Sequence, residues 1–534
     1  MQARLFLLLA ALFLLLTSRE PPWADAHVVY DTTESFVEHH DFQVRLEGGP
    51  PWFYVRPNGA TKGPKYGVFP LGNVLAMVPS YLTYKALRAI PGVPDRPLYA
   101  TACHVSPALL MAAACLLFYR MARRRLTPDR RGERWAVGLT LMLATSTIVF
   151  IYARSAYAEA LQTFALTWLV ERTLAAGRKP TVGALGWVGV AAGVLINAKL
   201  VFVLVLPLCA AYLVWVRLPH GDAGKVVLRA WLGLVELGAF VALALWHNHM
   251  KTGSLLDSGY QMRGGLFSGD LIPGVYGFLL SSGKGVFWYS PPLLLGILGL
   301  GESLRRFRND TLLMVAIALV TLVVNAKFRI WHADYCWGPR HLAPLSPLVL
   351  LWSLPWLPEA TARGRTGVRR AAMKTLFAAG IAVQLLGASI YWDHYIRALI
   401  AVKDQTGAPG WFRESLTQGH YVPVFSPLAG QAWLLGHMIR RDPDLDRDAP
   451  WKAVLPQNAN LAETWNRLRI DWWACEWITN KEPWRLGERP RELRGDPPVP
   501  IVPTSGALVV LSGALVAGWL GVRRRLRDEG YSAK

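Results

Sequence analysis

The sequence predicts an all-α polytopic membrane protein with about twelve transmembrane helices. Its 534 residues are 53% hydrophobic and only 17% charged, whereas a soluble domain carries about 25% charged residues. Apolar runs alternate with short Arg-rich segments, which is the positive-inside pattern of membrane proteins. The 23 Trp and 18 Tyr suit side chains that anchor at lipid–water interfaces. The net charge of +21 therefore indicates membrane topology, and no nucleic-acid partner is expected.

The apolar runs give the predicted crossings in order, since a membrane-spanning helix needs about 20 mostly apolar residues. The first run, residues 4–18, is short enough for a cleaved signal peptide. No small-x-small cleavage site follows it cleanly, so we interpret it as an uncleaved first helix. The other predicted crossings are 98–119, 135–152, 156–174, 182–197, 199–217, 230–247, 285–301, 311–326, 341–357, 375–395 and 504–522.

The basic loops set the predicted orientation. Residues 120–134 contain seven Arg, and the tail from Arg523 reads RRRLR. The loops 302–310 and 363–374 are also Arg-rich. We expect all four basic segments to lie on the cytoplasmic side of a cell inner membrane. The outer, periplasmic side then holds 19–97, 153–158, 248–284, 327–340 and 396–503.

One apolar segment, residues 67–90, disturbs this count. If it spanned the membrane, the seven-Arg loop would lie outside. Polar and helix-breaking residues weaken it as a lipid-facing span, so we interpret it as interfacial or re-entrant, with a true span as the alternative. These residues are Pro70, Gly72, Asn73, Pro79 and Ser80.

The chain divides into three predicted regions: 1–395, 396–503 and 504–534. The middle region carries eight Trp and is too aromatic for a flexible linker, so we expect it to fold against the outer membrane face. The last region is a final crossing followed by a basic cytoplasmic tail.

The five cysteines match no metal-binding template. Cys103, Cys115 and Cys209 lie in or beside apolar runs and are expected to be small core residues. Cys336 and Cys475 both lie in predicted outer segments. The sequence leaves two alternatives for them, a disulfide between the two or two unrelated thiols.

Acidic residues gather in the first outer loop, 19–66. Asp25 directly follows the first helix, and a partly desolvated carboxylate at the membrane surface can act as a general base. The four acids beyond it lie on a predicted amphipathic helix and are expected to be solvated. They are Asp31, Glu34, Glu38 and Asp41.

Basic and aromatic residues mark the outer ends of several predicted helices. Lys199 interrupts the 36-residue apolar run 182–217, where a charge is costly and indicates function; snorkelling to the interface is the alternative. Cations beside an interface suit a lipid-linked phosphate. The candidate substrate-binding residues are Lys65, Tyr66, Arg154, Glu159, Lys199, Lys284, Trp331, His332 and Arg340.

Several of these residues occur with a defined spacing. Asp25 precedes Asp41-Phe42 by sixteen residues, and Lys65-Tyr66 follows. Further on come Arg154 with Glu159 five residues later, and INAKL around Lys199. Two longer strings, GKGVFWYSPPLLL and WHADYCWGPRHLAPLSP, follow.

In this order the motifs resemble the GT-C superfamily of membrane glycosyltransferases. They are most similar to its bacterial branch that uses polyprenyl-phosphate sugars, which is related to protein O-mannosyltransferases and lipid A aminoarabinose transferases. The resemblance covers about residues 1–395. It implies a GT-C-like transmembrane catalytic region whose first outer loop carries the acidic motif, and its spacing selects Asp25 over Asp31 as the base.

The implied reaction is an inverting transfer of a sugar from a polyprenyl-phosphate carrier to an acceptor hydroxyl at the outer face of the cytoplasmic membrane. Asp25 would deprotonate the acceptor, and Lys65, Lys199, Lys284 or Arg340 would stabilise the leaving lipid phosphate. Membrane lipid is a further expected partner. The identities of the sugar and of the acceptor are not predicted.

The sequence departs from the family at its acidic pair, which is Asp25-Ala26 here instead of Asp-Glu. The missing second acid puts in doubt any metal role borrowed from relatives. His27 as its substitute and His39-His40 as a zinc pair are both disfavoured, the latter because a third ligand is lacking. The sequence therefore predicts no certain cofactor, and a divalent metal stays open without support from the sequence. No Walker or dinucleotide fingerprint occurs.

Two other classes of function are weighed. A transporter or lipid flippase would need charges at mid-membrane, where Glu236 is the clearest acid inside an apolar run. A non-catalytic membrane scaffold would use the Trp-rich region to bind a partner and would tolerate replacement of Asp25.

Overall fold

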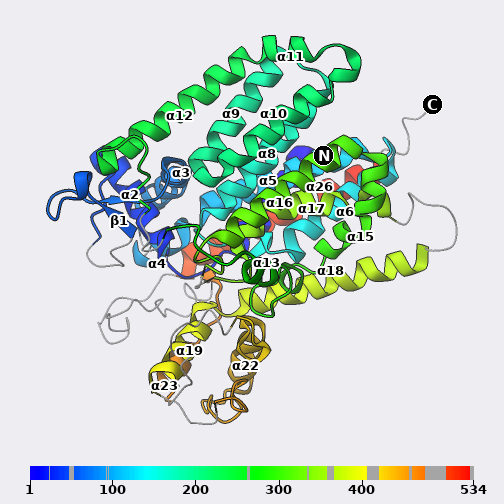
Figure 1. The fold of residues 1–534 in the computed structure, drawn as a ribbon. Coiled ribbons are helices and arrows are strands. Elements are labelled where there is room, and N and C mark those ends of the chain that lie inside the picture. Colours follow the sequence, from blue (N-terminus) through cyan, green and yellow to red (C-terminus); the bar gives the residue numbers. More distant parts are fainter. Residues whose placement is uncertain are drawn as a thin grey trace.

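The computed structural model describes residues 1–22, 24–46, 53–91, 93, 95–260, 265–333, 336–357, 366–405, 420–455, 460–474 and 501–528. These residues are mostly helical. They form a large helical bundle and a smaller helical unit, which Figure 1 shows below the bundle around α19, α22 and α23.

The N-terminal part of the bundle contains the first loop and the helix around which the core packs. Its elements are α1 (Gln2–Leu15), α2 (Asp25–His39), β1 (Tyr54–Val55), β2 (Tyr66–Gly67), α3 (Leu71–Arg88), α4 (Asp95–Ala102), α5 (Val105–Arg125), α6 (Arg130–Ser146), α7 (Val149–Ala153), α8 (Glu159–Arg178) and α9 (Val182–Ala198). The strands β1 and β2 pair antiparallel, with Val55 opposite Tyr66. This short hairpin is a feature that the all-α prediction did not include.

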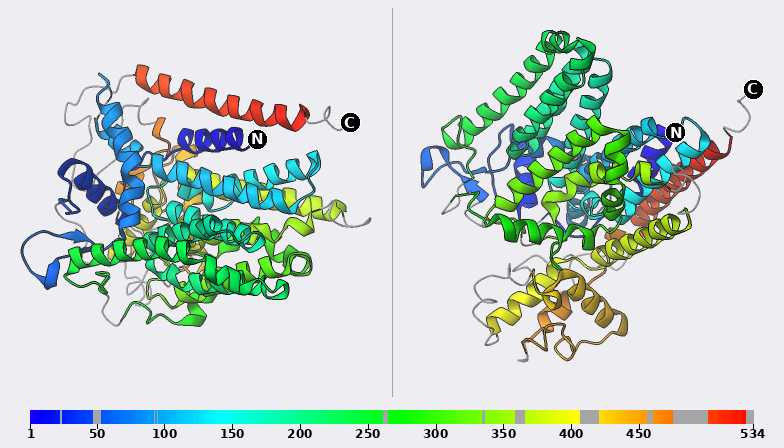
Figure 2. Two further views of the ribbon diagram at one scale, coloured as in Figure 1. Left: turned by 90° about the horizontal axis from the view of Figure 1, so that it is seen from above. Right: turned by 45° about the vertical axis from the view of Figure 1, so that its right-hand side comes forward.

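The second half of the bundle continues with further helices and short 3-10 segments. They are η3 (Leu200–Val205), α10 (Leu206–Trp215), α11 (Ala223–Arg229), α12 (Trp231–Thr252), α13 (Leu271–Leu279), α14 (Val286–Tyr289), α15 (Leu293–Arg306), α16 (Arg308–Lys327), η5 (Arg340–Leu345), α17 (Ser346–Leu351), α18 (Thr366–Ser389) and α26 (Ile501–Asp528). The helices α26 and α1 lie side by side, as Figure 2 shows for the red and dark blue helices, and Arg4 Nη1 donates to Gly521 O at 2.9 Å.

Six helices in the described part of the chain are long and apolar enough to cross a membrane: Pro97–Arg125, Leu200–His220, Trp231–Thr252, Arg308–Lys327, Gly367–Ser389 and Ser505–Arg527. Two shorter apolar helices, Gln2–Leu15 and Val182–Ala198, match two more predicted crossings. The other expected crossings fall on helices that are shorter, interrupted or more polar, so the total of about twelve stays a prediction.

The helix α3 (Leu71–Arg88) forms most of the segment 67–90, for which the sequence left open whether it crosses the membrane. It is not among the six helices named above. Its first turn is pressed against the end of α9: Asn73 Nδ2 donates to Ala198 O at 3.0 Å. A Cβ on Gly72 would lie 2.5 Å from Asn197 O, so glycine permits this close approach. The packing is consistent with the re-entrant interpretation of 67–90, which stays a prediction.

The core of the bundle is centred on α5. Within the apolar window of Pro97–Arg125, 67% of the residues are buried, compared with 11% for the window in Trp231–Thr252. The helix α12 therefore lies at the periphery of the bundle, whereas α5 packs against α1, α6 and α8.

The seven-Arg loop is tied to neighbouring helices by ion pairs. Arg124 Nη1 lies 2.7 Å from Glu171 Oε1 of α8, and Arg125 Nη2 lies 2.9 Å from Asp310 Oδ2 of α16. Part of this predicted cytoplasmic charge is thus neutralised within the bundle.

The smaller unit has its own hydrophobic core. It comprises α19 (Asp393–Gln405), α22 (Pro427–Arg440) and α23 (Ala462–Arg467), packed around side chains such as Tyr395, Trp433 and the fully buried Trp451. Tryptophans of this segment therefore fill a core. The residues 406–419 and 475–500 lie outside the described part of the chain.

Candidate functional site

Asp25 is the first residue of α2, in the turn that follows α1. The residue before it, Ala24, has a φ of +51°, a left-handed conformation that is uncommon for alanine. The Asp25 side chain is 21% exposed, and its Oδ1 accepts a hydrogen bond from the Ala26 amide at 3.2 Å. Asp25 is therefore partly desolvated but reachable.

Arg340 brings Asp25 together with Glu159. Its Nη1 lies 3.1 Å from Asp25 Oδ2, and its Nε lies 3.7 Å from Glu159 Oε1. The guanidinium also lies over the ring of Tyr157, at 5.1 Å from the ring centroid, a cation–π geometry. One cation thus links the starts of α2, α8 and η5, and three predicted site residues meet here.

A second cation, Lys199, lies at the junction of α9 and η3. Its Nζ donates to Asn325 Oδ1 and to His341 Nδ1, each at 3.2 Å. Because an ammonium group has only donors, the bond to Nδ1 leaves the ring proton of a neutral His341 on Nε2. His341 directly follows Arg340, so the two cations are joined through adjacent residues of η5.

Three buried polar atoms around these cations have no hydrogen-bond partner among the described residues. They are Glu159 Oε2, Tyr157 Oη and His341 Nε2. Buried polar groups in native structures are nearly always hydrogen-bonded. These three atoms are therefore available to hydrogen-bond a polar ligand beside the partly exposed Asp25 carboxylate.

A cavity opens beside Asp25, with about 390 Å³ of empty volume, part of it open to solvent. Apart from Asp25 and Asn73 its lining is largely apolar, and it lies between α2, α3, α5 and α8. The apolar side chains include Val29, Phe69, Met77, Leu110 and Leu161.

Lys65 and Tyr66 belong to the hairpin of the first loop. The Lys65 Nζ donates to Leu46 O and lies 4.9 Å from the centroid of the Tyr54 ring. Tyr66 pairs with Val55 in the sheet. Both residues thus contact the first loop itself, and their substrate-binding role stays a prediction.

Lys284 is fully buried beside Cys336. Its Nζ donates to Cys336 O at 3.0 Å and lies 3.0 Å from Cys336 Sγ. Cys336 is a free thiol, and Cys475 lies outside the described residues.

Trp331 and His332 are buried among aromatic side chains. The Trp331 ring lies 5.2 Å from that of Phe278, and the His332 ring lies 5.5 Å from that of His420. His332 therefore faces the segment that leads into α22.

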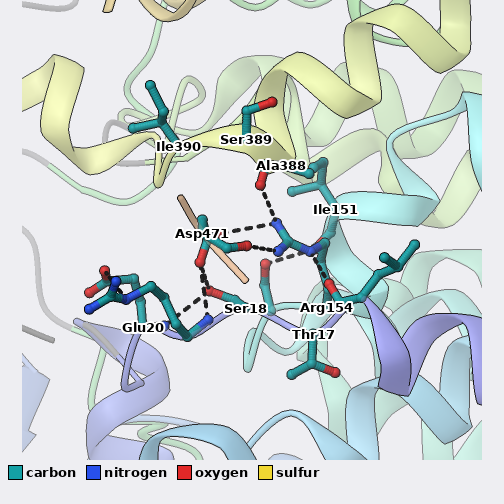
Figure 3. A network of polar contacts seen from close by, with 12 residues as sticks. Thr17, Ser18, Glu20, Ile151, Arg154, Ala388, Ser389, Ile390 and Asp471 are labelled. Carbon is teal, nitrogen blue, oxygen red and sulfur yellow. Dashed lines mark hydrogen bonds and ion pairs between the residues drawn. The ribbon is translucent and has the colours of Figure 1, made fainter. Parts of the chain in front are cut away.

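Arg154 lies in a different network from the one expected, which Figure 3 shows. Its Nε donates to Leu16 O at 2.6 Å, its Nη1 lies 3.0 Å from Asp471 Oδ2, and its Nη2 donates to Asp471 O. Nη1 also donates to Ala388 O at 3.3 Å. Protein groups thus occupy every nitrogen of the guanidinium, and Arg154 binds parts of the chain together.

The list of predicted site residues omitted Tyr157, Asn325 and His341. Tyr157 lies between Arg154 and Glu159, and His341 lies beside Arg340, so both were within the strings that marked the site. Asn325, near the end of α16, has no comparable signal in the sequence.

Among the described residues, no group of three or more His, Cys, Asp or Glu side chains is arranged to hold a metal ion. The cluster around Arg340 and Lys199 contains two cations, two carboxylates and one histidine.

These features define a helical membrane protein with a charged, partly buried site beside an apolar cavity. No family model matches the chain, and no curated protein matches it. It is similar to solved structures of ArnT from Cupriavidus metallidurans. The structure bound to undecaprenyl phosphate is 18% identical with a TM-score of 0.49, covering 83% of this chain and 77% of that one.

The apo structure of the same protein is 17% identical with a TM-score of 0.46, covering 84% of this chain and 72% of that one. ArnT is one of the lipid A aminoarabinose transferases that the motifs resemble. Both TM-scores lie below 0.5, so these similarities do not by themselves assign a function.

Proposed function

We propose that the protein is an inverting glycosyltransferase that moves a sugar from a polyprenyl-phosphate carrier to an acceptor hydroxyl. The observation that carries the proposal is the cluster in which Arg340 joins Asp25 and Glu159, with Lys199 next to it through His341. The cluster combines a carboxylate that can accept a proton with two cations that can hold a phosphate.

Asp25 acts as the general base. Its carboxylate accepts the proton of the acceptor hydroxyl, whose oxygen forms a bond to the anomeric carbon of the donor sugar. The bond between that carbon and the phosphate oxygen breaks, and its electron pair stays on the lipid phosphate. Attack opposite to the leaving group inverts the configuration.

Lys199 and Arg340 hold the phosphate of the donor. Charge-assisted hydrogen bonds to phosphate are stronger than neutral ones, and they strengthen as negative charge develops on the leaving group. The unpartnered Nε2 of His341 and Oη of Tyr157 supply further hydrogen bonds to the phosphate or the sugar, and Glu159 Oε2 accepts one from a sugar hydroxyl.

The remaining predicted site residues lie outside the cluster of Asp25, Glu159, Arg340 and Lys199. Lys65, Tyr66, Lys284, Trp331 and His332 are proposed as substrate contacts beyond this cluster. Arg154 is not, because its guanidinium is already bonded to Leu16, Ala388 and Asp471.

The apolar cavity suits an aliphatic chain whose polar end reaches Asp25. Burial of apolar surface stabilises such a chain by roughly 25 cal/mol per Å². With the Arg-rich loops on the cytoplasmic side, the reaction takes place at the outer face of the membrane.

The direct test is consumption of the donor. Purified protein in detergent is mixed with a radiolabelled polyprenyl-phosphate sugar and with cell-envelope extract as the source of acceptor. We expect label to leave the polyprenyl-phosphate donor and appear on another component of the extract with the wild-type protein and not with Asp25→Asn. Equal loss of label with both proteins would contradict the proposal. Movement of intact donor across proteoliposomes, without chemistry, would instead support a flippase.

A further inference from the structure

The C-terminal end of α1 is completed by residues from far along the chain. The last carbonyl groups of a helix have no partner within it, and α1 has no basic residue in its last turn. Leu15 O accepts hydrogen bonds from Trp472 Nε1 at 2.7 Å and Trp473 Nε1 at 3.0 Å. Leu16 O accepts one from Arg154 Nε. A cation at this end is also favoured by the helix dipole.

Asp471 fixes the next two residues of the same turn. Its Oδ1 accepts from Ser18 Oγ at 2.6 Å and from the Arg19 amide at 3.1 Å. Its Oδ2 pairs with Arg154 (Figure 3). The Asp471 and Arg154 side chains are only 3% and 4% exposed, so solvent screens this pair little.

Asp471 is itself held by the junction of the bundle with the smaller unit. Its amide donates to Ser389 O at 2.9 Å, at the end of α18, and Ile470 and Ile390 form an isolated bridge. These contacts hold Asp471, which follows the smaller unit in the chain, beside the C-terminal end of α1.

Both segments held by Asp471 lead directly into the candidate site. Asp25 follows Arg19 by six residues. On the other side, Arg154 is followed by Tyr157, which lies under Arg340, and by Glu159, which pairs with Arg340. A shift of either segment would change the geometry between Asp25 and Arg340.

We propose that Asp471 is a positioning residue for Asp25. It holds the turn after α1 and the segment 154–159 in register, and this is the role of the smaller unit in catalysis. This inference rests on the proposed glycosyltransferase function. It assigns to the segment Asp471-Trp472-Trp473 a task that does not require contact with a substrate.

The test compares Asp471→Asn with the same substitution in a second arginine–aspartate pair that lies away from the candidate site. Asn keeps an amide oxygen for Ser18 and Arg19 but removes the charge opposite Arg154. We expect kcat to fall by about tenfold or more, because small displacements of reacting groups are costly, while the donor KM stays within about twofold. The control is Asp310→Asn, which breaks the pair with Arg125 at 2.9 Å; it should lower thermal stability and leave kcat within about twofold.

Hydrogen exchange gives a readout independent of catalysis. In Asp471→Asn, the amides of α2 (Asp25–His39) should exchange faster, and in Asp310→Asn they should not. If exchange responds while neither the wild-type protein nor Asp25→Asn transfers sugar, the coupling between Asp471 and the start of α2 stands and the proposed function fails. If Asp25→Asn is inactive but neither exchange nor kcat responds to Asp471→Asn, the positioning role is overturned.

A milder variant covers the case in which Asp471→Asn does not fold. Trp472→Phe removes one N–H donor to Leu15 O and keeps most of the apolar contact. We expect it to fold, to accelerate exchange at the start of α2, and to lower kcat more than the donor affinity. Unchanged exchange and unchanged kcat would overturn the proposal.

Discussion

Lys199→Met is expected to weaken donor binding while the protein still folds. The change keeps an unbranched, apolar side chain and removes the ammonium. In the described structure that ammonium makes two hydrogen bonds to neutral groups, Asn325 Oδ1 and His341 Nδ1. The loss of these bonds is offset because the variant no longer buries a charge beside an apolar bundle. The net change in folding stability should therefore be small.

The effect on the donor should be much larger. Removal of one partner from a desolvated charge pair typically costs about 2–5 kcal/mol, and here the donor phosphate would lose the Lys199 ammonium. At about 1.4 kcal/mol per factor of ten, the lower end of this range already means roughly thirtyfold weaker binding. The loss of Lys199 also frees His341 Nδ1, so the ring no longer presents Nε2–H in a fixed tautomer, and this adds to the effect.

The assay measures both quantities on the same preparations. Thermal unfolding with increasing polyprenyl-phosphate sugar reports donor affinity through the ligand-dependent shift in Tm, and unfolding without ligand reports folding. Lys327→Met is the control, because Lys327 lies in the last turn of α16 outside the cluster. A Lys199→Met protein with unchanged donor affinity would refute the phosphate role and return Lys199 to snorkelling.

Three further predictions follow. Asp25→Asn should lower the rate of transfer by about 10²–10⁴-fold, measured with saturating donor, whereas Asp31→Asn should cost far less; equal losses would remove the preference for Asp25. A cysteine introduced into 120–134 should not react with an impermeant thiol reagent added outside, because this loop is predicted to be cytoplasmic. Labelling of that cysteine would place the loop outside and so indicate that 67–90 spans the membrane. Burial raises the pKa of Glu20 to about 7, opposed by Arg19. The folded protein thus keeps a proton that the unfolded chain loses above about pH 4.5, and stability should fall by about 3 kcal/mol as pH rises from about 4.5 to 7. Glu20→Gln should flatten that part of the plot of Tm against pH, and an unchanged plot would contradict the assignment.

The helices were the more predictable part of the molecule, because hydrophobic periodicity and length are local properties. The apolar runs at 98–119 and 230–247 correspond to the helices Pro97–Arg125 and Trp231–Thr252. The hairpin at Tyr54–Val55 and Tyr66–Gly67 was not expected, since strands of two residues give no alternating pattern.

The site was predictable in its residue types and only partly in its pairing. Lys199 was selected because a charge inside an apolar run indicates function. Asp25 was selected over Asp31 by the spacing that the GT-C resemblance implies, and Arg340 lies in one of the strings that carry this resemblance. The contact between Arg340 and Asp25 joins residues 315 positions apart, and no local pattern encodes such a contact. Arg154 shows the limit of the same reasoning. It directly follows α7 (Val149–Ala153), but its partner Asp471 is 317 positions away in a segment that the motifs do not cover.

In the proposed glycosyltransferase reaction, one arginine would serve both the base and the phosphate, and the formal charges of the site give the reason. With carboxylates at Asp25 and Glu159 and cations at Arg340 and Lys199, the substrate-free cluster is balanced, so a donor phosphate arrives as an excess negative charge. Transfer of the acceptor proton to Asp25 removes one negative charge at the moment when the leaving phosphate gains one. Arg340, which bonds Asp25 at 3.1 Å in the free protein, then loses its carboxylate partner and can direct its full charge to the phosphate. The proton transfer and the departure of the lipid phosphate therefore favour each other through a single guanidinium, which a lysine with one charged nitrogen could not bridge in the same way.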